Sequence, residues 1–292
     1  MTLVAMMLPV MAQQVEVTSV TRLLGHDQVP LRGFYPVLNP TGDRLLYQTA
    51  ESSGMEMCDM TTGHVATITT DYVAGNDACW GGDGKIYFVT QQVGDDHLVY
   101  RTGQCFDVEM GQCHRLAEPQ HGAVRAVSAT RGGALRAPTG TYRSSADIGN
   151  AAWTQGNRLH VMVNGEERVF SPVDSWAGYL WASLSPDGRR VAFFAAGKGI
   201  VVIDLRGQVT AMLGNYEMPC WFDNDHLVAQ NAKDDGHQFV SSQLVLLRAD
   251  GSWQAELTKP ESMTMQPTCG GGKIVYTTID GLLHVMKINI DQ

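Results

Sequence analysis

Short apolar runs alternate along the chain with polar turns rich in Asp, Asn, Gly and Pro, and one such strand-turn-strand unit recurs. In each copy a Pro or Ala near the start is followed by an apolar anchor, a polar turn, and a β-branched or aromatic run. The copies are residues 35–43 (YPVLNPTGD), 77–84 (DACWGGDG), 181–188 (WASLSPDG), 218–225 (MPCWFDND) and 266–272 (QPTCGGG), with a weaker one at 124–133 (VRAVSATRGG). Six copies of one element predict a repeat architecture.

The spacing of the copies indicates which architecture this is. Their apolar anchors are Leu38, Trp80, Val127, Leu184, Trp221 and Cys269. The spacings of 42, 47, 57, 37 and 48 residues average about 46, which is typical of a propeller blade of four short strands. Asp59, Asp107 and Asp204 stand just before the expected turn between the third and fourth strands. We expect their carboxylates to accept backbone N–H groups in that turn.

Ring closure tests the count of six. After the last anchor the chain has room for two further strands and not three, whereas residues 15–23 (VEVTSVTRL) form an alternating strand before the first unit. We expect this strand to pair beside residues 282–288. The predicted fold is therefore all-β: a six-bladed β-propeller of four-stranded antiparallel blades over residues 13–292, with the last blade closed by the N-terminal strand.

These units resemble the WD40-like (PD40) repeats of the TolB-like propeller family, which includes TolB and the propeller domains of prolyl oligopeptidase and dipeptidyl peptidase IV type enzymes. The resemblance covers about residues 15–290, and the family's WSPDG motif is complete except for its Trp at residues 184–188 (LSPDG). It implies the fold but no activity, because the motif is a strand-turn-strand element without chemistry of its own.

The amino-acid composition limits the classes of partner that the protein is expected to bind. The chain of 292 residues is 44% hydrophobic and 17% charged, which suits a globular core, and its formal net charge is -9. Nucleic acids and anionic membranes are bound by clustered Lys and Arg, and no such cluster occurs. We therefore expect no nucleic-acid partner. We also expect a monomer without a transmembrane segment and without a cofactor.

The first twelve residues (MTLVAMMLPVMA) are apolar and are followed by Gln13 and Gln14. We interpret residues 1–12 as the end of a secretory signal peptide, which places the protein in the periplasm or elsewhere outside the cytoplasm of a bacterium. The alternative is a packed or disordered N-terminus.

The six cysteines fall into two groups. Cys79, Cys220 and Cys269 occupy nearby positions in three units, on the strand that a propeller buries innermost, and are expected to be small core residues. Cys105 and Cys113 flank the predicted turn at residues 107–111, so they are a possible cross-strand disulfide, with two reduced thiols as the alternative.

No catalytic motif is present: the chain contains no G-x-S-x-G, H-E-x-x-H, P-loop or C-x-x-C pattern. We therefore assign no catalytic and no metal-binding residue. Exposed aromatic side chains on loops suit peptide or carbohydrate contacts, and they otherwise pack over blade ends. The candidate ligand-binding residues, in or beside the loops at one end of the blades, are Arg32, Phe34, Tyr72, Trp176, Tyr179, Trp181, Tyr216 and His237.

Two further features are expected at the same end of the blades as these candidate residues. His97 and His237 lie beside pairs of aspartates in two predicted loops between second and third strands, where solvated histidines are favoured over a metal site. Residues 138–158 are an insertion in the third unit, which we expect to be a loop that reaches toward the same face.

The leading hypothesis is a non-enzymatic, exported propeller that binds a protein, peptide or glycan through its loop face. One alternative is a metal-assisted lyase or hydrolase acting on a polysaccharide, and another is a structural module of an envelope assembly.

Overall fold

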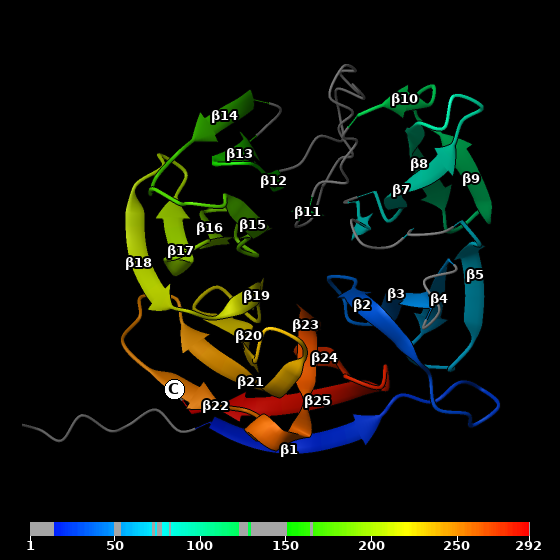
Figure 1. Cartoon of the computed structure of the whole chain (residues 1–292). Coiled ribbons are helices and arrows are strands. Elements are labelled where there is room, and N and C mark those ends of the chain that lie inside the picture. Colours follow the sequence, from blue (N-terminus) through cyan, green and yellow to red (C-terminus); the bar gives the residue numbers. More distant parts are fainter. Residues whose placement is uncertain are drawn as a thin grey trace, which may run out of the picture.

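A computed structural model describes residues 15–49, 54–71, 74, 78–81, 83–122, 128–129, 151–163 and 166–291. Within these residues, six antiparallel sheets surround a central axis, as predicted (Figure 1). The described part of the chain contains one short helix, η1 (Pro260–Ser262), and no helix long and apolar enough to cross a membrane.

Each blade runs from an inner strand at the axis to an outer strand at the rim. Blade 1 contains β2 (Gly33–Leu38), β3 (Arg44–Thr49), β4 (Met55–Asp59) and β5 (Val65–Thr69). Blade 2 contains β6 (Cys79–Trp80), β7 (Ile86–Val93), β8 (Val99–Asp107), β9 (Gln112–Arg115) and β10 (Gln120–His121). Blade 3 contains β11 (Ser128–Ala129), β12 (Ala151–Gln155), β13 (Arg158–Val163) and β14 (Glu166–Phe170). Blade 4 contains β15 (Tyr179–Leu184), β16 (Arg190–Ala195), β17 (Gly199–Asp204) and β18 (Val209–Gly214). Blade 5 contains β19 (Glu217–Trp221), β20 (His226–Asp234), β21 (Phe239–Arg248) and β22 (Gln254–Glu256). Blade 6 contains β23 (Thr264–Gly270), β24 (Lys273–Thr278), β25 (Leu283–Ile290) and β1 (Val15–Arg22).

The two ends of the chain share the sixth blade, as the sequence predicts. β1 pairs antiparallel with β25, from Val15 opposite Ile290 to Arg22 opposite His284, with one irregularity near Thr18. The N-terminal strand is thus the outermost strand of a blade whose other strands come from the C-terminal end (Figure 1).

The core lies between blades rather than within one blade. Phe193 and Val201 of blade 4 pack with Leu159 of blade 3, and equivalent clusters join blades 4 and 5, 5 and 6, 6 and 1, and 1 and 2. A blade has two apolar faces, and each face is removed from water only by the neighbouring blade.

Four inner strands carry the same β-bulge. Tyr35, Trp181, Met218 and Gln266 occupy its equivalent position with φ between 50° and 54°, a left-handed conformation that is uncommon outside glycine. The bulge N–H groups of two blades bond across to the preceding blade: the backbone N–H of Tyr35 donates to Gln266 Oε1 at 2.8 Å, and that of Gln266 donates to Gln230 Oε1 at 2.9 Å. These side-chain amides therefore connect blade 5 to blade 6 and blade 6 to blade 1.

Two of the predicted anchors also connect blades. The indole Nε1–H of Trp80 donates to the backbone oxygen of Val37 at 3.1 Å, and that of Trp221 donates to the oxygen of Ser183 at 3.0 Å. In each case an inner strand is fastened to the inner strand of the preceding blade.

The expected turn aspartates are confirmed. Asp59 accepts N–H groups from residues 61 and 62, Asp107 from residues 109 and 110, and Asp204 from residues 206 and 208. Blade 2 differs from the other blades in that its outer strand is split into β9 and β10, which lie before and after Pro119. Both pair with β8, each with a different part of it.

Two expectations need correction. The insertion at residues 138–158 is not a loop throughout, because Ala151–Gln155 forms strand β12 and pairs with β13 across a turn at residues 156–157; residues 130–150 lie outside the described part. The Cys105–Cys113 disulfide does not form either, since both are free thiols. Cys105 stands opposite His114 and Cys113 opposite Phe106, so the two side chains lie on opposite faces of the hairpin.

Deleting residues 15–22 should leave β25 as an unpaired edge and expose one side of blade 6 to water. We expect Tm to fall by more than about 10 °C in thermal unfolding followed by circular dichroism. Glu16→Ala, an exposed position on the same strand, is the matched control and should leave Tm unchanged.

Trp221→Phe should remove the hydrogen bond to Ser183 and leave space between blades 4 and 5. The expected loss is about 2 kcal/mol in the free energy of unfolding, measured by urea titration. Trp176→Phe changes an exposed indole instead and should have no such effect; equal losses in the two variants would contradict the role given to Trp221.

Candidate functional site

The loops between second and third strands, and most of those between one blade and the next, lie on one side of the ring, which we call the loop face. The loop between β1 and β2 also reaches the other side, where the N–H of His26 donates to the oxygen of Gly63 at 2.8 Å. The turns between first and second and between third and fourth strands lie on the other side, the turn face. Large exposed apolar side chains gather at the loop face, on its loops and the adjoining strand ends. Those described are Tyr35, Val93, Leu98, Trp176, Leu180, Trp181, Phe239, Val240 and Ile279.

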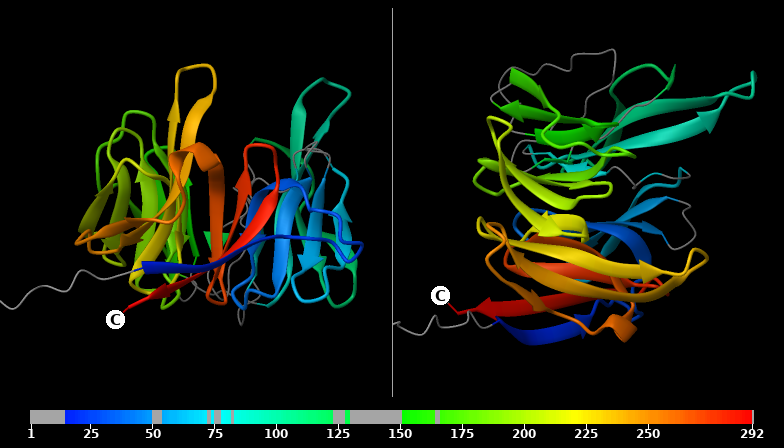
Figure 2. Two further views of the ribbon diagram at one scale, coloured as in Figure 1. Left: turned by 90° about the horizontal axis from the view of Figure 1, so that it is seen from below. Right: turned by 60° about the vertical axis from the view of Figure 1, so that its left-hand side comes forward.

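Two hairpins rise above the rest of the loop face, β7–β8 and β20–β21 (Figure 2). They belong to blades 2 and 5, which stand opposite each other in a ring of six. Their strands have eight to ten residues, compared with five or six in the second and third strands of blades 1, 3 and 4. Each hairpin extends beyond its blade, so its tip projects into solvent.

The tip of β7–β8 combines apolar and acidic groups. Val93 is 69% exposed and Leu98 is also exposed. Between them Asp96 accepts the Tyr100 hydroxyl at 2.7 Å and the backbone N–H of Leu98 at 3.0 Å, which holds the pKa of Asp96 below its usual value. The carboxylate is therefore charged at neutral pH and keeps the turn in one shape.

The tip of β20–β21 has the same character. Phe239 is 42% exposed and Val240 is exposed beside it. Asp235 accepts the backbone N–H groups of Gln238 and His237, each at 2.9 Å, and these bonds lower its pKa. Two opposite blades thus present exposed apolar side chains beside an ionised carboxylate.

A third feature lies between blades 3 and 4. The indole of Trp176 is 84% exposed and rests against Gly197, where a Cβ atom would stand 2.8 Å from the ring. Its loop is fastened to both blades: Asn157 Nδ2 donates to the oxygen of Ser175 at 3.0 Å, and Ser175 Oγ lies 3.1 Å from the oxygen of Ala196. An exposed Trp held in place loses little conformational entropy on binding.

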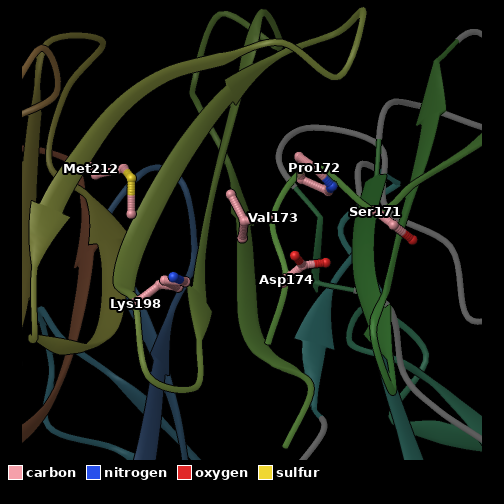
Figure 3. Close-up of a pocket in the computed structure, with 6 residues that line it drawn as sticks. All are labelled: Ser171, Pro172, Val173, Asp174, Lys198 and Met212. Carbon is pink, nitrogen blue, oxygen red and sulfur yellow. The ribbon is translucent and has the colours of Figure 1, made fainter. Parts of the chain in front are cut away.

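The same loop borders a shallow cavity of about 340 Å³ (Figure 3). Its lining combines apolar side chains with one acidic and one basic residue, and consists of Ser171, Pro172, Val173, Asp174, Lys198 and Met212. Since Lys198 follows Gly197 directly, the cavity and the Trp176 ring share the loop between β16 and β17.

Of the aromatic residues that the sequence suggested for ligand binding, the structure exposes some and buries others. Trp176 is exposed as expected, and Trp181 is 38% exposed with its ring tilted against Phe194. Tyr179 is only 2% exposed, and its hydroxyl donates to the oxygen of Val173, so it packs in the core. Tyr216 is half-buried against the blade 4 and 5 cluster, and its hydroxyl bonds Gln254 at 2.8 Å.

The remaining predicted residues do not converge on one site. Arg32 donates to the backbone oxygen of Asp280 at 2.6 Å and lies 3.7 Å from its carboxylate, while Phe34 packs near Gly281. His237 is exposed at the β20–β21 tip. Tyr72 lies outside the described residues.

Each of the two hairpin tips carries a histidine close to two aspartates. His97 is exposed, and its φ of 61° serves the turn of the β7–β8 hairpin. Over the ranges that the structure describes, no three His, Cys, Asp or Glu side chains gather closely enough to hold a metal ion.

The exposed apolar residues of the hairpin tips were missed from the sequence. A signal for them exists in two segments, residues 93–99 (VGDDHLV) and 233–240 (KDDGHQFV). In both, two aspartates and a histidine are followed by two consecutive large apolar residues. The sequence indicates solvated histidines in these two segments, and the structure adds that both tips also expose large apolar side chains.

No family model matches the sequence, and no curated protein matches it. Solved structures with a similar fold include TolB from Acinetobacter baumannii, with a TM-score of 0.52 and 15% identity over 76% of this chain and 53% of that one. The chain therefore spans about half the length of that TolB. A chain of the mitotic checkpoint complex gives a TM-score of 0.61 at 12% identity, over 97% of this chain and 98% of that one. Oligogalacturonate lyase in complex with manganese gives 0.52 at 11% identity, over 89% and 79%.

At these identities the likeness establishes the fold alone. The chain is a six-bladed propeller with TolB and WD40-type propellers among its structural neighbours.

Ser175→Ala should loosen the loop that carries Trp176, because it removes the hydroxyl that bonds the backbone of Gly178 and Ala196. Amide hydrogen exchange in residues 171–178 should become about 10-fold faster, measured by mass spectrometry. Ser252→Ala, at an exposed position on the turn face, should not change those rates. Unchanged exchange in Ser175→Ala would show that other contacts hold the loop.

Proposed function

We propose that the protein is an exported, non-enzymatic propeller whose loop face binds a polypeptide partner. The observation that carries this proposal is the gathering of large exposed apolar side chains on one side of the ring. Contiguous apolar exposure on a folded protein marks an interaction surface, and aromatic side chains in fixed positions contribute most to such interfaces.

The distribution of these side chains supports a face rather than scattered exposure. Val93 and Phe239 come from two different blades and Trp176 from the loop between two others, but all three lie on the same side. Fewer large apolar residues of comparable exposure are described elsewhere: Met110 and Val209 on the turn face, Val17, Val20, Val169 and Met212 on outer strands, and Val29 between β1 and β2. A partner bound to the loop face would therefore remove more apolar surface from water than one bound elsewhere.

Charge favours a basic partner. Each hairpin tip carries an aspartate pair, at residues 95–96 and 234–235, in a chain of net charge -9. Asp96 and Asp235, with lowered pKa values, stay ionised through the physiological pH range. A segment with apolar residues flanked by Lys or Arg would complement both tips, and its association would be faster at low salt.

The test combines Trp176→Ala with Phe239→Ala, since each removes an exposed ring without disturbing the core. Proteins of an envelope extract retained by the immobilised wild type are compared by quantitative mass spectrometry with those retained by the double variant. We expect a specific partner to be depleted at least 10-fold, with Tm changed by less than about 2 °C.

Met110→Ala is the matched control, because Met110 is 65% exposed on the turn face. It should retain the partner as the wild type does. A photo-cross-linking phenylalanine analogue placed at position 239 should attach to the same partner, and one at position 110 should not. Equal retention by all variants would refute the assignment of the loop face.

A further inference from the structure

Two cysteines that lie far apart in sequence meet between blades 5 and 6. Cys220 is on the inner strand β19 and Cys269 on the inner strand β23, 49 residues later. Their Sγ atoms are 2.9 Å apart, and both are free thiols. Cys105 and Cys113, by contrast, lie on opposite faces of their hairpin.

The repeat itself brings the two sulfurs together. Cys269 occupies the anchor position of its unit, and Cys220 directly precedes the anchor of the preceding unit. Side chains of neighbouring positions point to opposite faces of a strand, so a one-residue offset lets an inner strand of blade 5 and one of blade 6 face each other here. Both cysteines are half-buried and pack against the same apolar cluster between these blades.

We propose that Cys220 and Cys269 are a modification site: they form a disulfide that joins blades 5 and 6 when the protein meets an oxidising disulfide. A disulfide has an S–S distance of about 2.05 Å, so bond formation needs the two sulfurs to approach each other by about 0.9 Å. The bond would link two inner strands close to their turns at residues 222–225 and 271–272, on the turn face.

The chemistry balances as a thiol–disulfide exchange. The thiolate of one cysteine attacks a sulfur of a small-molecule disulfide, breaks its S–S bond and releases one thiolate, which takes up the first proton. The second cysteine then attacks the resulting mixed disulfide and releases the other thiolate with the second proton. The protein loses two protons and two electrons, and one external disulfide is reduced to two thiols.

The neighbourhood of Cys269 sets the conditions for this reaction. Burial, together with the adjacent Cys220 thiol, raises the pKa of Cys269 well above its usual value. Its thiolate is therefore rare at neutral pH, and exchange is slow there because the thiolate is the reacting form. Oxidation in the experiment is accordingly carried out at pH 8.5.

The experiment uses the full chain, reduced and then incubated with oxidised glutathione. The thiol count in denaturant should fall from six to four, and Tm of the oxidised form should rise by about 5–10 °C. Trypsin places Cys220 in the peptide of residues 207–233 and Cys269 in that of residues 249–273. Non-reducing mass spectrometry should find these two peptides joined, and reduction should separate them.

Cys220→Ser should abolish the joined peptides and the rise in Tm, whereas Cys113→Ser, which removes an exposed thiol, should keep both. Six free thiols after oxidation, or a bond that joins any other pair, overturns the proposal. The wild-type peptide measurement decides this even where a variant folds poorly. Because the pair lies on the turn face, this outcome is independent of partner capture by the loop face.

Discussion

The fold depends on the mutual covering of blade faces, which only a closed ring completes. Each blade contributes strands such as β16 and β17 whose side chains are buried on both sides, by blade 3 on one side and by blade 5 on the other. An open arc would leave two such faces in water, at a cost proportional to the apolar area exposed. The pairing of β1 with β25 removes that cost, because it completes the sixth blade from both ends of the chain.

Hydrogen bonds between inner strands make this packing specific. A bulge places Tyr35 and Gln266 in a left-handed conformation, which costs about 1 kcal/mol or more for a residue other than glycine. The compensation is visible, since the N–H groups freed at both bulges are bonded by amides from the preceding blade. Trp80 and Trp221 act in the same direction, so neighbouring blades are aligned by directed bonds as well as by apolar contact.

The sequence could predict what repeats and little of what differs between copies. The anchors, the turn aspartates and the shared blade follow from spacing and from local turn chemistry, both of which are local signals. Tyr179 shows the limit: its place beside an inter-blade loop suggested exposure, yet its ring is buried in a tilted contact with Phe193, with centroids 4.8 Å apart. Whether an aromatic side chain covers a neighbouring blade or faces water depends on contacts between distant segments, which periodicity does not report.

The cysteines illustrate the same limit in another way. Reasoning from one hairpin made Cys105 and Cys113, which are close in sequence, a possible disulfide, because a tight turn brings its flanks together. The register then decides the outcome, and a shift of one residue sends the two side chains to opposite faces. Cys220 and Cys269 were correctly placed on inner strands, but their contact arises only when two blades are set side by side.

The two sides of the ring differ in how freely they can change. On the turn face, blades are bonded to each other through the repeat motif itself: Asn224 accepts the backbone N–H of Asp187 at 3.0 Å, and Lys273 Nζ donates to the oxygen of Gly42 at 2.7 Å. A longer turn there would break contacts between blades. On the loop face, by contrast, β7–β8 and β20–β21 extend outward without altering the packed part of their blades, because added residues only lengthen a hairpin. A binding surface can therefore be built on the loop face at little cost to the ring, and the exposed apolar tips are found on that side.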